Sequence, residues 1–434
     1  MDLIDELEKI IKEKGIHTIE VVHADTLGIL GAKMIPAKSF LKNYKSGFGV
    51  CRASLGWDIQ GNLFEGVEIT DFNTGCPDVI VKPILSTFRE IPWRKGSAFV
   101  FGEIYEENGE IFKYAPREIL KKLVIRYEQL KYRPLVGVEL EFYLLDNERQ
   151  KLHQGIHTYS LSKGLELEYI LGEIRNNLND IGIELEATHM EYGPAQVEII
   201  TEYGDALDAA DKTVLLKSIV KEAARKYDLY ATFMAKPWTQ ESGSGFHVHQ
   251  SLWNLELNKN IFQHDKKIAN RYLAGLTNTT SEFMAFTSPS INSYKRFNKY
   301  SFAPVSESWG YDNRTVAVRS LLSNGKGSRL EQRIGSSDAN PYLAIAASLA
   351  GGLYGLENEL NLCESTSTDA YLTTEKLLPK NLEQALDKLE KSKIAKKYFN
   401  EEFIKLFLAI GRNEINLYEQ SVTDWEFNRY LEYS

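Results

Sequence analysis

Two glutamates, Glu139 and Glu141, stand one residue apart in an apolar run, Val136-Gly-Val-Glu-Leu-Glu-Phe-Tyr-Leu-Leu145. The β-branched and aromatic residues of this run predict a strand that is buried on at least one face. Alternate residues of a strand point to the same side, so both carboxylates share one face. Two like charges in a low-dielectric site are costly unless cations neutralise them. The run is therefore either an open sheet face with two solvated glutamates or one wall of a cation site.

The composition excludes several classes of protein. At 434 residues the chain is expected to form two or three domains. A formal net charge of -9 argues against nucleic-acid binding along a basic face. No apolar run approaches the roughly 18 residues of a membrane span, so no membrane partner is expected.

The cysteines and the N-terminus bear on the compartment. Cys51, Cys76 and Cys363 show no paired spacing, which fits a reducing compartment and argues against a thiolate zinc site. The chain begins Met-Asp-Leu-Ile-Asp-Glu-Leu-Glu, which is acidic and has no signal-peptide pattern. We therefore expect a cytoplasmic protein.

Strand-like and turn-like segments dominate the first hundred residues. Residues 2–14 alternate apolar and charged positions at helical spacing and predict a short amphipathic helix. A strand is predicted at 19–25, followed by a turn at 25–28 that leads to a second strand. Because no long helix interrupts this pattern, residues 1–104 are expected to form a small mixed β domain.

Long helices between strands characterise the rest of the chain. Helices are predicted at 116–130, at 207–228 and at 340–358, the last buried because it is rich in Ala and Leu. The last 55 residues also have a largely helical pattern. The chain is therefore expected to be α+β, with a large second domain at residues 105–434.

A second pair of carboxylates flanks a Gly-Pro turn. Glu191 and Glu198 lie in the segment Glu186-Ala-Thr-His-Met-Glu-Tyr-Gly-Pro-Ala-Gln-Val-Glu198. The turn would bring the two glutamates together from the two sides of a hairpin-like bend. A surface hairpin without a ligand is the alternative interpretation of this segment.

Two histidines follow a glycine-rich turn in Ser242-Gly-Ser-Gly-Phe-His-Val-His-Gln-Ser251. His247 and His249 share one face if this segment is a strand. Imidazole is a common metal ligand, and exposed glycine amides can bind anions. The other interpretation is a pair of ordinary structural histidines.

Arginines cluster in one part of an otherwise acidic chain. Arg314, Arg319, Arg329 and Arg333 lie within 20 residues of one another. A guanidinium group suits carboxylate or phosphate. Arg329 and Arg333 would share a strand face with Glu331, although a solvated charged strand also fits this pattern.

Taken together, these segments offer carboxylates and imidazoles to cations, and arginines to anions. Oxygen-rich ligation suits Mg²⁺ or Mn²⁺ better than zinc. Divalent cations beside an arginine cluster are typical of phosphoryl transfer. The chain has neither a Gly-x-x-x-x-Gly-Lys-Ser/Thr loop nor a kinase signature, so it would hold a nucleotide in another way.

At these residues the chain resembles the glutamine synthetase superfamily. The matching segments follow the family's order and cover nearly the whole chain. They are Ile91-Pro-Trp, Gly137-Val-Glu-Leu-Glu-Phe, His189-Met-Glu-Tyr-Gly-Pro-Ala-Gln-Val-Glu198, Lys236-Pro, Gly243-Ser-Gly-Phe-His-Val-His249, Asn292-Ser-Tyr-Lys-Arg296, Asn313-Arg314, Arg329-Leu-Glu-Gln-Arg333, Asn340-Pro-Tyr-Leu and Val422-Thr-Asp-Trp-Glu426.

The resemblance implies a β-grasp-like N-terminal domain and a catalytic domain with a curved antiparallel sheet and helices. It also implies a homododecamer of two hexameric rings, with active sites between subunits. Two or more divalent cations, Mg²⁺ or Mn²⁺, are implied in each active site. The positions that match cation ligands are Glu141, Glu191 and Glu198 for one ion, and Glu139, His247 and Glu331 for a second.

ATP and glutamate are the implied substrates, together with an amine. ATP phosphorylates the γ-carboxylate of glutamate, and the amine then displaces phosphate. The positions that match ATP contacts are Glu186, His249, Ser251, Lys326 and Arg329. The matches on the substrate side are Arg296 for glutamate, Arg314 and Arg333 for the phosphoryl group and the acyl phosphate, and Gly243, Phe302 and Trp309 for the substrate site.

Two departures from the family pattern bear on the amine. Glutamine synthetases carry a glutamate in a Gly-Tyr-Glu-Ala-Pro loop, where this chain has Phe302 in Phe-Asn-Lys-Tyr-Ser-Phe-Ala-Pro. They also carry an aspartate in a Phe-Asp-Gly-Ser-Ser motif, which is absent from the corresponding stretch Val50-Cys-Arg-Ala-Ser-Leu-Gly-Trp57. Both anionic groups that would attract ammonium are missing.

These departures predict a γ-glutamyl-amine ligase that uses an organic amine. An aromatic amine of low pKa would react without a strong base, whereas a polyamine or alkylamine would need Glu307 or Asp312 as the base. The segment Ser308-Trp-Gly-Tyr-Asp-Asn-Arg-Thr-Val-Ala resembles the γ-glutamylpolyamine branch. The alternatives are an ammonia-using glutamine synthetase and a catalytically inactive scaffold or regulatory relative.

Overall fold

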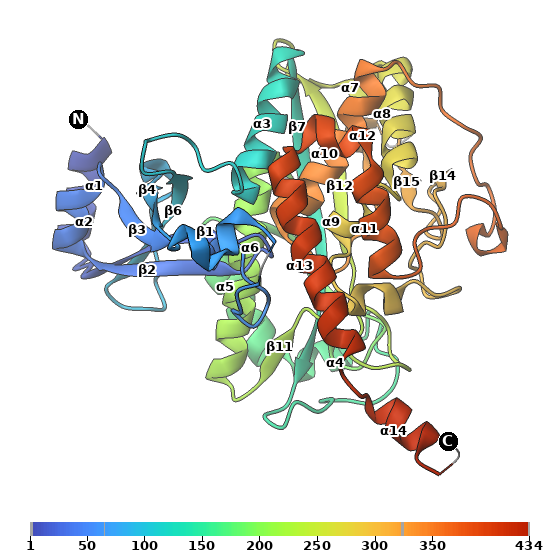
Figure 1. Cartoon of the computed structure of the whole chain (residues 1–434), viewed down its shortest axis with the longest axis horizontal. Coiled ribbons are helices and arrows are strands. Elements are labelled where there is room, and N and C mark those ends of the chain that lie inside the picture. The colour runs from blue at the N-terminus through green and yellow to red at the C-terminus, as the bar shows by residue number, and fades with distance from the viewer. Residues whose placement is uncertain (1–2, 65, 323–324, 433–434) are drawn as a thin grey trace.

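The structure is a computed structural model that describes residues 3–64, 66–322 and 325–432, with two sheets of different size (Figure 1). The smaller sheet has the strand order β2-β1-β6-β4-β3, with β5 paired to β6. Its elements are α1 (Leu3–Glu13), β1 (Thr18–Ala24), β2 (Leu30–Pro36), α2 (Ala37–Asn43), β3 (Phe48–Cys51), β4 (Asp78–Pro83), β5 (Arg89–Glu90) and β6 (Ser97–Tyr105). The predicted first helix and first two strands are confirmed.

The larger sheet has the order β14-β15-β16-β12-β7-β9-β8, and its described pairings are antiparallel except that of β14 with β15. Its strands are β7 (Tyr132–Leu145), β8 (Leu185–Met190), β9 (Gln196–Thr201), β10 (Gly204–Asp205), β11 (Tyr230–Thr232), β12 (Phe246–Asn254), β13 (Lys259–Asn260), β14 (Trp309–Tyr311), β15 (Val318–Ser320) and β16 (Leu330–Gln332). The predicted strand with its two glutamates is therefore the central strand β7, between β12 and β9.

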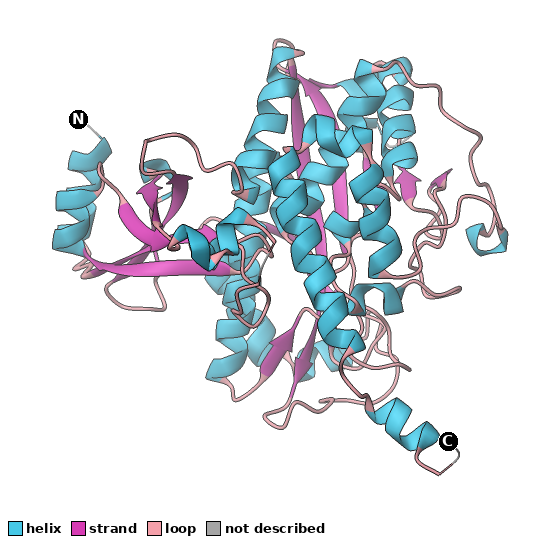
Figure 2. Cartoon of the chain, in the orientation of Figure 1, coloured by secondary structure: helices cyan, strands magenta, loops and turns pink. Residues whose placement is uncertain are grey.

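Helices pack around the larger sheet and cover much of it (Figure 2). They are α3 (Pro116–Gln129), α4 (Leu161–Glu166), α5 (Glu168–Asp180), α6 (Ala206–Lys226), α7 (Ile261–His264), α8 (Lys266–Thr279), α9 (Met284–Thr287), α10 (Pro341–Glu357), α11 (Leu382–Lys391), α12 (Lys393–Tyr398), α13 (Glu401–Glu419) and α14 (Asp424–Tyr430). Almost every residue of α10 is buried, as its Ala-rich and Leu-rich sequence predicts. The helices predicted at 116–130, 207–228 and 340–358 are confirmed, and so is the α+β class.

A polar contact ties the turn after β1 to the start of α10. The amide of Asn340 donates to the carbonyl oxygens of Asp25 and Thr26 at 3.3 and 3.0 Å. Gly28 has φ +82, and a Cβ on it would lie 2.8 Å from the Asn340 Cα. The turn thus needs glycine both for its left-handed backbone and for its close approach to Asn340. No helix in the described ranges is long and apolar enough to cross a membrane.

Candidate active site

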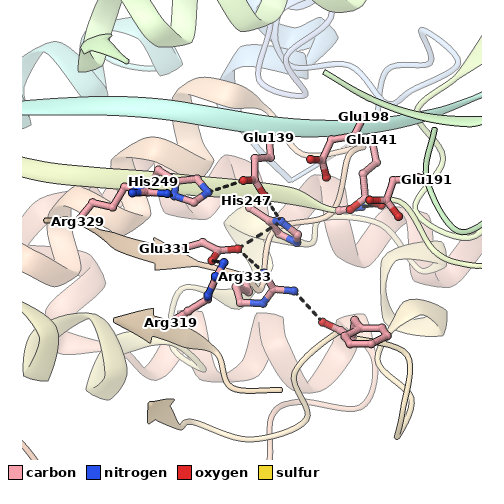
Figure 3. Close-up of polar contacts among 12 residues, drawn as sticks. Glu139, Glu141, Glu191, Glu198, His247, His249, Arg319, Arg329, Glu331 and Arg333 are labelled. Atoms are coloured by element: carbon pink, nitrogen blue, oxygen red, sulfur yellow. Dashed lines mark hydrogen bonds and ion pairs between the residues drawn. The ribbon is translucent and has the colours of Figure 1, made fainter. Parts of the chain in front are cut away.

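Strand register brings the predicted cation ligands together in the middle of the larger sheet (Figure 3). Glu139 of β7 is opposite His247 of β12, and Glu141 is opposite Glu198 of β9. On the other side of β12, His249 is opposite Glu331 of β16. Side chains from four neighbouring strands therefore meet in one place, although they are far apart in the sequence.

Glu139, His247 and Glu331 form the first potential metal-binding group. One ligand atom from each lies within 4.8 Å of the others, and this trio is the one that the family resemblance implies. The His247 Nδ1 lies 2.9 Å from Glu139 Oε2 and 3.5 Å from Glu331 Oε1. An additional imidazole is near, since His249 Nε2 lies 2.9 Å from Glu139 Oε1.

Glu198 is shared by two further groups of potential ligands. One joins it to Glu141 and His247, and the other to His189 and Glu191. The predicted trio of Glu141, Glu191 and Glu198 is thus divided between two overlapping groups. Glu198 belongs to both groups, Glu141 to the first and Glu191 to the second. His189 was not predicted as a ligand. It precedes Glu191 by two residues near the end of a strand, and this spacing is the signal that could have found it.

The carboxylates crowd one another strongly. Burial, together with the charges of the surrounding glutamates, raises the pKa of Glu198 to about 10. Burial and the charge of Glu191 raise the pKa of Glu141 to about 7. Such a site favours either protonation or a positive partner, and a divalent cation supplies positive charge to several carboxylates at once. The donor set of carboxylates and imidazoles therefore fits Mg²⁺ or Mn²⁺.

Two arginines already neutralise the innermost carboxylate. Glu331 is fully buried, accepts a hydrogen bond from Arg319 Nη1 at 3.0 Å, and is ion-paired with Arg333. Burial opposes ionisation of Glu331, but the combined positive charges of Arg333, His249 and His247 outweigh it and lower the pKa of Glu331 to about 2. The sequence pattern grouped Arg319 with the other arginines but gave it no role, whereas the structure places it on Glu331.

Arg296 lies beneath the acidic cluster and has spare hydrogen-bonding capacity. Only 5% of it is exposed; its Nη2 donates to the Arg333 carbonyl at 3.2 Å, and its buried Nη1 has no hydrogen-bond partner among the described residues. Burial lowers its pKa to about 10. A Cβ on Gly243 would lie 2.6 Å from the Arg296 Cγ, and one on Gly245 would lie 2.9 Å from Arg296 Nη2. Both glycines therefore leave space for this guanidinium, which suits a ligand carboxylate.

A cavity of about 400 Å³ opens beside Glu139. Four residues that match ATP contacts line it: Glu186, His249, Ser251 and Arg329. Arg329 Nε donates to His249 Nδ1 at 3.1 Å, which fixes the two side chains relative to each other. The side chain of the fifth, Lys326, lies outside the described part of the chain.

The remaining predicted site residues differ in their surroundings. Phe302 has φ +58, is 58% exposed, and accepts a hydrogen bond at its carbonyl from Arg333 Nη2 at 3.3 Å. Arg314 is exposed, and no hydrogen bond or ion pair joins it to another described residue. Trp309 is 3% exposed and its indole donates to the Cys363 carbonyl at 3.0 Å. Phe302 thus lies beside Arg333, whereas neither Arg314 nor Trp309 forms a hydrogen bond with Arg333.

Comparison with known proteins gives the family of the chain. The family model "Glutamine synthetase, catalytic domain" matches residues 113–430. The chain belongs to the glutamine synthetase family. Members of this family are ATP-dependent ligases that use a divalent metal.

Full-length relatives include both amine ligases and glutamine synthetases. A glutamate–isopropylamine ligase of Pseudomonas sp is 37% identical, with 97% of this chain and 96% of the relative covered. A type-1 glutamine synthetase 2 of Dictyostelium discoideum is 35% identical, with 95% and 83% covered. The γ-glutamylethanolamide synthetase GlnA4 of Streptomyces coelicolor is 31% identical, with 99% and 96% covered. Among solved structures, the GmaS/ADP complex superposes with a TM-score of 0.88 at 28% identity, with 99% of each chain covered.

Replacing Glu198 with Gln tests the metal site. Gln keeps the shape of the side chain but removes a charged ligand, so the metal-free melting temperature should stay unchanged or rise as repulsion falls. Loss of even a supporting group costs metal affinity about 10–100-fold, so the stabilisation by Mn²⁺ should shrink. Thermal unfolding with and without Mn²⁺ measures both effects. The exposed E184Q is the matched control, and equal Mn²⁺ stabilisation of E198Q and E184Q would contradict the assignment.

Proposed function

We propose that the protein is an ATP-dependent ligase that joins the γ-carboxylate of glutamate to an organic amine through γ-glutamyl phosphate. The observation that carries this proposal is Phe302 beside Arg333, at the position where glutamine synthetases hold a carboxylate. Two full-length relatives, the glutamate–isopropylamine ligase and the γ-glutamylethanolamide synthetase, support an organic amine as the acceptor.

The substrates are assigned to parts of the site by charge. We propose that Arg296 binds glutamate, because its unpartnered Nη1 suits a carboxylate. ATP would occupy the cavity lined by His249, Ser251 and Arg329, with its phosphates directed to the acidic cluster. Two or more divalent ions, Mg²⁺ or Mn²⁺, would be held by Glu139, Glu141, Glu191, Glu198, His247 and Glu331. When bound, they would neutralise the phosphate charge.

The reaction has two displacements. An oxygen of the γ-carboxylate attacks the γ-phosphorus of ATP, the bond from that phosphorus to the bridging oxygen breaks, and ADP leaves. The nitrogen of the amine then attacks the acyl carbon, phosphate leaves with the electrons of the C–O bond, and the nitrogen loses a proton. We propose that Arg333, with Arg314, stabilises the negative charge that develops in both steps. Glu331 and the Phe302 carbonyl hold the Arg333 guanidinium in place for this role.

The group that accepts the proton of the amine is what would separate this chain from an ammonia-using enzyme. An alkylamine with a pKa of about 10 is protonated at neutral pH and must lose a proton before attack. Phe302 cannot accept a proton, and Asp312 is ion-paired with Arg319 through a contact of 2.9 Å. The carboxylate of Glu307 has no hydrogen bond or ion pair with another described residue, so we propose Glu307 as the base.

Several further features are proposals of the same kind. We propose the division into an N-terminal domain, 1–104, and a catalytic domain, 105–434, and assembly into a dodecamer of two hexameric rings. Active sites between subunits follow from that assembly. The use of ATP and glutamate suits the cytoplasm as the compartment.

An amine panel tests the function. Purified protein with ATP, Mg²⁺ and glutamate should release phosphate with isopropylamine, ethanolamine, a polyamine or an aromatic amine. Its kcat/KM for the best of these should exceed that for ammonium by at least about tenfold, or about 1.4 kcal/mol in transition-state binding. Phosphate release and mass spectrometry of the product measure this. A preference for ammonium would favour a glutamine synthetase, and no turnover across the panel would favour an inactive relative.

Exchanging Phe302 for Glu tests the specificity assignment. Glutamate at this position restores an anion that attracts ammonium, so kcat/KM for ammonium should rise by about tenfold or more relative to the best organic amine. F302L is the control, because it keeps an apolar side chain without adding a base. Since all three residues must adopt the same left-handed backbone, the comparison isolates side-chain chemistry. An unchanged ratio in F302E would show that this position does not select the amine.

A further inference from the structure

A second cavity, of about 590 Å³, lies apart from the acidic cluster and is larger than the one beside Glu139. It is bounded by the turn after β1, by α6, by β11 and the residues after it, and by α13. In Figure 1, α13 lies to the right of α6. None of the predicted metal, ATP or substrate residues lines this cavity.

Most of the cavity wall is apolar. Leu27 and Ile29 come from the turn, Phe233 follows β11, and Phe407 and Ile410 belong to α13. Apolar walls with a few polar groups are typical of a site for a small organic molecule. The volume would accommodate a ligand of about ten or more non-hydrogen atoms, by comparison with cavities of about 300–1,000 Å³ that hold drug-sized ligands.

Two lysines give one wall of the cavity a positive charge. Lys217 and Lys221 are four residues apart on α6 and so lie on the same face of the helix. The Nζ of Lys217 donates to the Ala339 carbonyl at 2.8 Å, and the ammonium groups lie 5.6 and 5.8 Å from the centre of the Phe233 ring. No carboxylate among the described residues forms an ion pair with either lysine.

Asp338 and Glu414 also line the cavity, and neither forms an ion pair with Lys217 or Lys221 within the described ranges. Asp338 directs one oxygen to the hydroxyls of Ser290 and Ser293, the latter at 2.8 Å. Burial lowers the pKa of Lys217 to about 7, although the negative charge of Asp338 opposes this, and burial also lowers the pKa of Lys221. Two lysines held in an apolar wall without a paired anion are costly, and a ligand anion would relieve that cost.

We propose that this cavity binds a small organic carboxylate with an apolar body. The carboxylate pairs with Lys217 and Lys221, and the body packs against the aromatic and aliphatic side chains of the turn and α13. This ligand class follows from two features of the cavity. Lys217 and Lys221 have no ion-pair partner among the described residues, and most of the other lining side chains are apolar. A neutral molecule of the same shape would lack the charged interaction.

The cavity also shares a wall with the glutamate site. Asn292 lines the cavity, and it begins the 3₁₀ helix Asn292–Arg296 whose last residue is Arg296. Asp338 lies in the same wall and binds Ser293 of that helix. A ligand that changes the position of Asp338 or Asn292 therefore acts on Arg296 through one short helix. This coupling rests on the proposed function, whereas binding to the cavity does not.

Calorimetric titration of the full chain with octanoate and with 1-octanol tests the binding. Octanoate should bind at one site per chain and at least tenfold more tightly than octanol, which has the same chain without the charge. In K217M and K221M, which keep apolar stems, this preference should fall to less than threefold. K212M is the control, since Lys212 lies on α6 outside the cavity and pairs with Asp208 at 2.8 Å.

Equal affinity for octanoate and octanol, no octanoate binding, or unchanged binding in both K217M and K221M would overturn the site. Melting temperatures show whether K217M and K221M are folded. If one of them fails to fold, octanoate binding by the other variant decides the test. With turnover assays, octanoate should change the KM for glutamate at least twofold in the wild type but not in K221M. Binding without such a change would overturn the coupling to Arg296, and a failure of turnover altogether would count against the proposed function alone.

Discussion

Repulsion among buried carboxylates is the main constraint on the centre of the larger sheet. Glu139, Glu141, Glu198 and Glu331 project from adjacent strands into one small volume. An apolar sheet centre would be easier to form, so these residues are accommodated only where positive groups compensate them. His247, His249 and the arginines provide part of that compensation, and divalent cations fit the remainder.

The arginines connect this acidic centre to Phe302 and to Arg296. Arg333 is ion-paired with Glu331, donates to the Phe302 carbonyl, and accepts at its own carbonyl from Arg296. A single residue thus contacts Glu331 of the potential metal-binding group, the Phe302 backbone and Arg296, for which we propose glutamate binding. Under the proposed function, the conformation of Phe302 therefore bears on both the charge of the site and the choice of amine.

The period of a strand was enough to predict that Glu139 and Glu141 share a face, and helical spacing predicted α3, α6 and α10 closely. The pairing of Glu141 with Glu198 and of Glu139 with His247 could not be derived from periodicity, because it depends on how segments far apart in sequence come into register. Family resemblance supplied the grouping instead. His189 was overlooked although its spacing from Glu191 was a usable signal. Arg319 was overlooked as a partner of Glu331, since neither spacing nor residue type shows which of several nearby arginines a folded chain brings to a carboxylate. The lysine-lined cavity likewise depends on the packing of α6 against α13 and the turn, which no local pattern predicts.

The central claim is that glutamate is activated as an acyl phosphate before the amine reacts. Glutamate labelled with ¹⁸O in its γ-carboxylate provides the most direct test, with ATP, Mg²⁺ and the best amine of the panel. Because a carboxylate oxygen becomes the bridge to phosphorus, the phosphate released should carry one ¹⁸O atom per turnover. Turnover that releases unlabelled phosphate, with the second ¹⁸O atom of the γ-carboxylate lost to water, would contradict this account.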